Sequence, residues 1–90
     1  MNKSNLESLK NEILKKAVVR GKVILSSGKE ADFYVDLRRV TLDSVAAPLV
    51  GEVMLDLTEN LDYEAVGGLT LGADPVATAM LHAASREVRN

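Results

Sequence analysis

The 90-residue chain has no cysteine, one histidine and only three aromatic residues. Without cysteine it can form no disulfide, no thiolate nucleophile and no cysteine-based zinc site. A single histidine, His82, excludes a zinc site built from several histidines of one chain. Since Phe33, Tyr34 and Tyr63 are the only aromatic residues, we expect a core of aliphatic side chains.

The chain also lacks a strong net charge and any long apolar run. A formal charge of −2 provides no general attraction to nucleic acid or to an anionic membrane. No apolar run approaches the roughly 18 residues that span a bilayer, and Met1 to Glu12 is too polar for a signal peptide. We therefore expect a cytoplasmic protein without nucleic-acid or membrane partners. Its length allows one small domain, or part of one.

A helix and a hairpin are predicted first. Ser4 and Glu7 form a capping-box pair, and apolar residues recur at helical spacing after them. The pattern predicts a helix from about Asn5 to Val19, with Gly21 as its stop. Residues 22–25 and 32–37 are predicted to form two strands, because apolar and polar residues alternate in the second of them.

A second helix, a strand and a third helix are predicted next. The second helix is expected to start no earlier than about Asp43, with Pro48 in its first turn. The apolar run Glu64 to Leu69 predicts a buried strand, and Asp74-Pro75 predicts a helix start with Asp74 as the cap. The order α-β-β-α-β-α indicates an α/β protein that lacks the further strands of a parallel sheet.

The glycine-bearing loop Gly67 to Asp74 is the strongest candidate for chemistry. It is not a Walker A motif, because Ala73-Asp74 stands where Lys and Ser or Thr are required. Its glycines are also at the wrong spacing for a dinucleotide fingerprint. Two interpretations stay open: a strand-to-helix turn that needs glycine, or a phosphate site made of backbone N–H groups at a helix start.

Other polar residues have simpler interpretations. The turn Ser26 to Lys29 could receive an anion, but such a turn is more often only a turn. Asp36 and Arg38 are predicted to form an exposed ion pair. At most one of Arg38 and Arg39 is expected to point into any one site, because neighbours on a strand face opposite ways. His82 is interpreted as a surface or structural residue.

Two segments together resemble a known family. Val23 to Asp36 is similar to the amino-terminal signature of orotate phosphoribosyltransferases, in which a Ser-Gly-Lys turn joins two strands. Leu37-Arg38-Arg39-Val40-Thr41-Leu42 and Gly67 to Ala79 resemble the actinobacterial branch of that family. The similarity extends from about residue 17 to residue 84.

The resemblance implies the amino-terminal part of a type I phosphoribosyltransferase fold. Residues 1–42 would form a helix and the orotate-side hairpin, and residues 43–90 the start of the α/β core. The family transfers ribose-5-phosphate from 5-phosphoribosyl 1-diphosphate (PRPP) to orotate, with Mg²⁺ on the diphosphate, in pyrimidine nucleotide synthesis. Its members are cytoplasmic homodimers whose active sites take residues from both subunits.

The resemblance also implies which residues bind orotate. The expected contacts are Ser26, Ser27, Lys29, Tyr34 and Val35, with the ring of Tyr34 facing the pyrimidine. Ser26 stands where many members have a ligand-contacting lysine. Whether Lys29 replaces that positive charge is left open.

The PRPP or pyrophosphate contacts are expected at Thr70, Leu71, Gly72 and Ala73. Many members have Tyr-Lys in place of Leu71-Gly72, so backbone N–H groups must do more of the binding here. The family motif also predicts a cis peptide near Thr70–Leu71.

The family's catalytic loop and its acidic PRPP motif would follow Asn90, so no catalytic residue is assigned within the chain. We therefore expect a fragment that is inactive alone. The alternatives are a non-catalytic ligand-binding or dimerisation module, and an unstable remnant.

Overall fold

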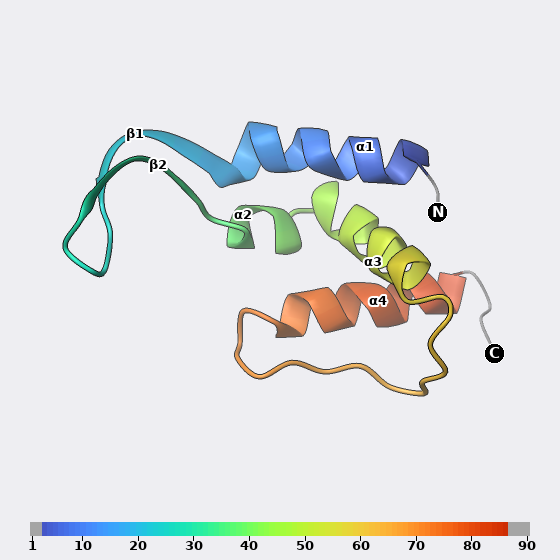
Figure 1. Ribbon diagram of the computed structural model, residues 1–90. Helices are drawn as coiled ribbons and strands as arrows, with labels where there is room; N and C mark the ends of the chain where they lie inside the picture. Colours follow the sequence, from blue (N-terminus) through green and yellow to red (C-terminus); the bar gives the residue numbers. More distant parts are fainter. Residues whose placement is uncertain (1–2, 87–90) are drawn as a thin grey trace.

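Residues 3–86 form a set of packed helices from which one hairpin projects (Figure 1). The structure is a computed structural model, and it describes these residues of the chain. The elements in order are α1 (Lys3–Glu12), the π-helical segment η1 (Ile13–Ala17), β1 (Val18–Ile24), β2 (Glu30–Val35), α2 (Arg38–Thr41), α3 (Ala46–Leu57) and α4 (Asp74–Arg86).

The first helix ends earlier than predicted. The chain leaves η1 at Val18, which has extended backbone angles of φ −82° and ψ 112°. Gly21 is not a helix stop, because it lies inside β1 with φ +112°. The valines 18 and 19 pair instead with Val35 and Tyr34. Their β-branched side chains favour a strand, and the partner strand provides the hydrogen bonds.

The predicted hairpin is confirmed, with a longer first strand and a second strand that begins and ends two residues earlier than predicted. β1 and β2 are antiparallel, and the pairing is irregular between Arg20 and Val23. In the turn, the Leu25 amide donates to the Lys29 carbonyl (2.9 Å) and the Gly28 amide to the Leu25 carbonyl (2.8 Å). Gly28 has φ +86°, a conformation that favours glycine. The hairpin thus carries its turn well away from the helices (Figure 1).

The start of α3 agrees with the sequence pattern. One carboxylate oxygen of Asp43 accepts hydrogen bonds from the amides of Val45 (3.0 Å) and Ala46 (2.9 Å). Asp43 therefore caps the helix, and Pro48 lies in its first turn. The short helix α2, which precedes Asp43, was not predicted.

The core lies between the helices and is small and aliphatic. One cluster joins η1, α2 and α3 through Ala17, Val40, Ala46 and Val50. A second cluster joins α3 and α4 through three further buried side chains: Leu55, Met80 and Ala83. The expectation of an aliphatic core is confirmed for the described residues.

The predicted strand Glu64 to Leu69 is not formed. These residues belong to a long connection from α3 to α4 and are exposed, except for half-buried Val66 (Figure 1). A buried strand requires a neighbour for its backbone hydrogen bonds. Within residues 3–86 the only sheet is the β1–β2 hairpin, which does not pair with this segment. The described part is therefore mixed α/β without a parallel sheet.

Candidate functional site

The residues expected to bind orotate fall into two groups. Ser26, Ser27 and Lys29 lie in the exposed turn of the hairpin. Tyr34 and Val35 lie at the opposite end of β2, where Tyr34 is half-buried and pairs with Val19. Lys29 precedes Tyr34 by five positions, which is about 16 Å along a strand. The structure therefore does not bring the turn and Tyr34 together.

A charged cluster directly follows Tyr34 and Val35. Arg38 Nε lies 3.0 Å from Asp36 Oδ1, and Arg38 Nη2 lies 3.3 Å from Asp36 Oδ2. The Arg38 amide also donates to Asp36 Oδ1 (3.2 Å). The predicted Asp36–Arg38 ion pair is thus confirmed. Arg39 joins it, with Nε 3.7 Å from Asp36 Oδ2.

The sequence pattern did not predict that Arg38 and Arg39 would share one carboxylate. Both belong to helix α2 and not to a strand, so the rule that neighbours face opposite ways does not apply. The Arg38 hydrogen bond is the main cause that lowers the pKa of Asp36 below its usual value. The signal in the sequence was an acid followed by arginines two and three positions later.

The loop before α4 is a hydrogen-bonded turn. The Ala73 amide donates to the Thr70 carbonyl (3.0 Å), and the Asp74 amide donates to the Leu71 carbonyl (3.3 Å). Gly68 lies so close to Ala73 that a Cβ at this glycine would overlap the Ala73 side chain. Two of the amides near the helix start are thus already bonded within the turn, whereas the side chains of residues 70–72 are exposed.

Two details of this loop differ from the sequence expectations. Helix α4 begins one residue earlier than predicted, because the amides of Val76 and Ala77 donate to the Ala73 carbonyl. Ala73 therefore occupies the cap position expected for Asp74. The predicted cis peptide near Thr70–Leu71 is wrong for this structure, whose described peptide bonds are all trans.

The remaining candidates are simple surface features. His82 is exposed on α4, as expected, and lines an open depression together with Thr41 and Asp43. Among residues 3–86 no three acidic or histidine side chains are grouped closely enough to hold a metal ion. The helices of the described chain are too short or too polar to cross a membrane.

Comparisons with known proteins identify relatives of the chain. No family model matches it. It is 70% identical over 82 residues to the orotate phosphoribosyltransferase of Streptomyces avermitilis, which covers 91% of this chain and 45% of the relative. It is 56% identical over 88 residues to the enzyme of Mycobacterium avium, covering 98% of this chain and 49% of the relative.

The chain is homologous to the actinobacterial orotate phosphoribosyltransferases. It corresponds to their amino-terminal portion and spans about half the length of the curated relatives that it matches. The Mycobacterium tuberculosis enzyme, solved with inorganic phosphate, superimposes with a TM-score of 0.85 at 55% identity, over 89% of this chain and 48% of that one. The same enzyme solved with PRPP gives 0.80 at 53% identity, over 88% of this chain and 46% of that one.

The structural comparison also identifies the fold. The helices and the hairpin form part of the type I phosphoribosyltransferase fold found in the orotate phosphoribosyltransferases. The family and the fold predicted from the two sequence motifs are thus confirmed. The assignment of individual ligand contacts to the hairpin and to the loop before α4 stays a prediction.

Proposed function

We propose that the chain forms the amino-terminal half of an orotate phosphoribosyltransferase. The reaction transfers ribose-5-phosphate from PRPP to N1 of orotate and releases orotidine 5′-monophosphate and pyrophosphate. The observation that supports this proposal most strongly is the 70% identity over 82 residues to the S. avermitilis enzyme. Because the match covers 91% of the chain, it includes all or nearly all of the hairpin and of the glycine-bearing loop.

The proposed orotate contacts begin at Tyr34 and Val35. Tyr34 is half-buried at the base of the hairpin, so its ring is partly fixed and can present a face to a planar pyrimidine. Ser26, Ser27 and Lys29 are proposed as further contacts from the hairpin turn. Because that turn lies far along β2 from Tyr34, the hairpin would have to bend for both groups to reach one ligand.

The proposed pyrophosphate contacts are Thr70, Leu71, Gly72 and Ala73. These residues carry no cationic side chain, so backbone N–H groups and the Thr70 hydroxyl would bind the phosphate oxygens. The N-terminus of the 13-residue helix α4 follows the loop and favours negative charge. The Ala73 amide is bonded to Thr70, so its use would require that turn to open.

The magnesium ion belongs to the substrate in this proposal. The described residues offer no group of three acidic or imidazole side chains, so they do not form a Mg²⁺ site by themselves. We propose that Mg²⁺ arrives bound to the diphosphate oxygens of PRPP, because Mg²⁺ favours phosphate oxygens as ligands. Within the chain, the residues then position orotate and the leaving pyrophosphate, and none is assigned a catalytic role.

The similarity to orotate phosphoribosyltransferases also supports a proposal for the arrangement of the intact protein. Residues 1–42 would serve the orotate side, and residues 43–90 the start of the α/β core. We propose a homodimer in the cytoplasm. PRPP and orotate are the proposed ligands, with no nucleic-acid or membrane partner.

A chimeric enzyme tests the proposed function. The 82 matched residues of this chain would replace the equivalent segment of the S. avermitilis enzyme, and formation of orotidine 5′-monophosphate would be measured. We expect turnover within about tenfold of the parent, since this corresponds to only about 1.4 kcal/mol of barrier. Tyr34→Ala in the chimera should raise the KM for orotate, whereas Tyr63→Ala, in the connection after α3, should not. A folded but inactive chimera would contradict the proposal.

The isolated chain gives a second measurement. We expect the 90 residues alone to form little or no orotidine 5′-monophosphate. Turnover at the rate of the intact enzyme would overturn this expectation. Saturable binding of orotate by a chain whose chimera is inactive would favour the alternative, a non-catalytic binding module. Absence of a cooperative thermal transition would favour the unstable remnant.

A further inference from the structure

Two residues at opposite ends of the loop before α4 lie in contact. Gly68 and Ala73 are five positions apart, which is about 16 Å in an extended chain. In the structure, a Cβ on Gly68 would overlap the Ala73 Cβ and would lie 3.3 Å from the Ala73 Cα. The segment between them, residues 69–72, therefore turns back sharply before the chain enters α4 (Figure 1).

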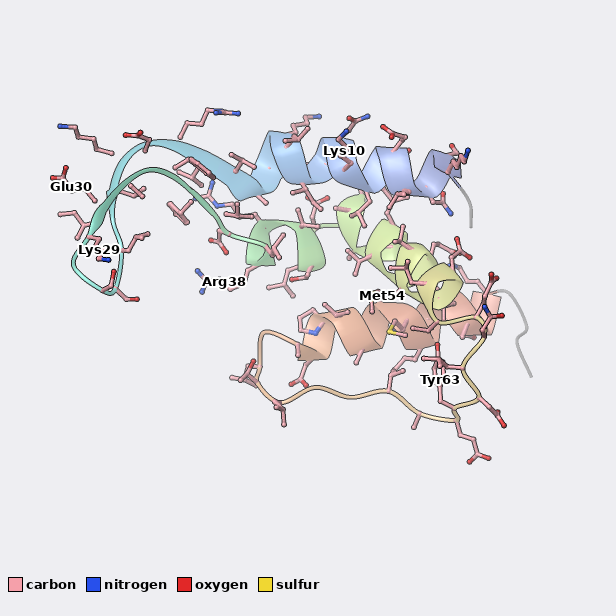
Figure 2. The ribbon with its side chains drawn as sticks, in the orientation of Figure 1. Lys10, Lys29, Glu30, Arg38, Met54 and Tyr63 are labelled. Carbon is pink, nitrogen blue, oxygen red and sulfur yellow. The ribbon has the colours of Figure 1, made fainter. Side chains whose placement is uncertain are left out.

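The chain on both sides of this contact is attached to the helices. The hydroxyl group of Tyr63, on the connection from α3 to α4, lies 2.6 Å from that of Thr58 at the end of α3 (Figure 2). Val66 packs against the buried cluster between α3 and α4. The Ala73 carbonyl accepts two hydrogen bonds from the first turn of α4. Because both flanks are held, a side chain at Gly68 would have to displace one of them.

Space, and not backbone freedom, requires glycine at position 68. None of the three glycines of this segment has a positive φ. A Cβ at Gly67 would meet nothing within 4 Å. A Cβ at Gly72 would reach only the Thr70 hydroxyl oxygen at 3.7 Å, which is an ordinary contact. Gly68 is therefore the glycine of this segment whose missing side chain shapes the loop.

The groups that this turn presents are suited to a diphosphate. Within residues 3–86, the amides of Leu71 and Gly72 donate no hydrogen bond. The Thr70 hydroxyl group lies beside Gly72, as its distance to a Cβ there shows. Backbone N–H groups and hydroxyl groups donate to phosphate oxygens. The spacing of these donors depends on how sharply residues 69–72 turn back.

We propose that Gly68 is a positioning residue for the pyrophosphate loop. Its lack of a side chain lets the loop meet Ala73, and this contact holds Thr70, Leu71 and Gly72 at the spacing that a diphosphate requires. The inference rests on the proposed function, in which these three residues contact pyrophosphate. Gly68 acts through them and does not itself contact the ligand.

The chimeric enzyme of the proposed function, with residues 67–73 of this chain in it, tests this role. Gly68→Ala should raise the Kd for pyrophosphate and the KM for PRPP by about tenfold or more, because small misplacements of binding groups are costly. The KM for orotate should stay within about twofold. Gly68 is exposed and lies outside both buried clusters, so the melting temperature should change little. A purely structural role would lower it.

Gly67→Ala is the matched control. It adds the same methyl group to the neighbouring glycine, where the group meets nothing, so it should leave the pyrophosphate affinity unchanged. The double variant Gly68→Ala with Ala73→Gly removes the methyl group that the new Cβ would strike, and it keeps the backbone amide at position 73. It should recover most of the lost affinity.

Each outcome bears on the assignment. If Gly68→Ala binds pyrophosphate as Gly67→Ala does, or if the double variant is no better than Gly68→Ala, the assignment of Gly68 is wrong while the proposed function stands. If Gly68→Ala does not fold, the double variant decides: the affinity of the parent chimera supports the contact, and a tenfold loss overturns it. If the parent chimera neither forms orotidine 5′-monophosphate nor binds pyrophosphate, the proposed function fails, and the assignment of Gly68 fails with it.

Discussion

At the residue scale, Lys16 links the first helical segment to the start of α3. Its Nζ lies 2.8 Å from Glu12 Oε1 and 2.7 Å from Asp43 Oδ2. The hydrogen bond to Asp43 is the largest cause that raises the pKa of Lys16, followed by the one to Glu12. Asp43 in turn has a lowered pKa. The largest cause is the hydrogen bond that it accepts from Lys16, followed by the one that it accepts from the Ala46 amide. One carboxylate therefore caps a helix and binds a distant lysine.

The Asp43 contacts predict a loss of stability in acid. A carboxyl group whose pKa is lowered on folding stabilises the fold above its unfolded pKa of about 3.9, and this stability is lost as the pH falls through the folded value. Asp43→Asn should therefore lower the melting temperature at neutral pH and make melting less dependent on pH below about 4. Thermal melts at several pH values measure both effects.

Asp62→Asn serves as the control for Asp43→Asn. Asp62 is exposed in the connection after α3, so its replacement should leave the melting temperature and its pH dependence unchanged. If Asp43→Asn melts as the wild type does at every pH, Asp43 does not stabilise the fold through these contacts.

At the element scale, α3 and α4 pack closely because one of them carries a glycine. Gly51 is buried in α3, and a Cβ at this position would overlap the carbonyl group of Ala79 in α4. The Cβ of Ala83 would also lie within 3.2 Å. Close approach of the two helices then brings Leu55, Met80 and Ala83 into one buried cluster. The spacing of the helices is thus set by the absence of one side chain.

This packing predicts that Gly51→Ala destabilises the fold. Alanine favours a helix over glycine by about 1 kcal/mol, but the added methyl group must push α3 and α4 apart. Overpacking of a close contact typically costs about 1–3 kcal/mol, so we expect a net loss in the free energy of unfolding measured in urea. Gly67→Ala is the matched control, since a Cβ there meets nothing within 4 Å. Equal stability of the two variants would contradict the close contact.

At the scale of the whole molecule, the chain is extended for its length. Its radius of gyration is 14.9 Å, compared with about 12 Å for a compact domain of 90 residues. The projecting hairpin and the connection from α3 to α4 account for this shape (Figure 1). Large apolar side chains stay exposed, among them Leu61 at 66% and Leu69 at 102%. Exposed apolar surface of this kind favours association.

The exposed leucines predict self-association of the isolated 90-residue chain. Light scattering during gel filtration should show an apparent mass that rises with protein concentration. The double variant Leu61→Ser and Leu69→Ser should reduce that rise, because it removes apolar side chains that face solvent. Leu6→Ser, on α1 and 41% exposed, should have a smaller effect. A wild-type chain that is monomeric at all concentrations would contradict the prediction.

Local sequence signals determined the elements whose stability is local. The hairpin turn requires Gly28, and the start of α3 requires Asp43 and Pro48, so both could be predicted from neighbouring residues. The family could also be predicted, because its two motifs are continuous in the sequence. The ion pair of Asp36 and Arg38 needed only a separation of two residues.

Tertiary structure decided what depends on distant partners. Gly21 lies in a strand because Val18 and Val19 pair with residues of β2, and segment 64–69 is not a strand because the described chain provides no neighbour for it. Arg38 and Arg39 share Asp36 because the chain turns into helix α2. The sequence determined which residues favour each local conformation. Only the tertiary structure decided which of those conformations found the hydrogen-bond partners and the packing that hold them.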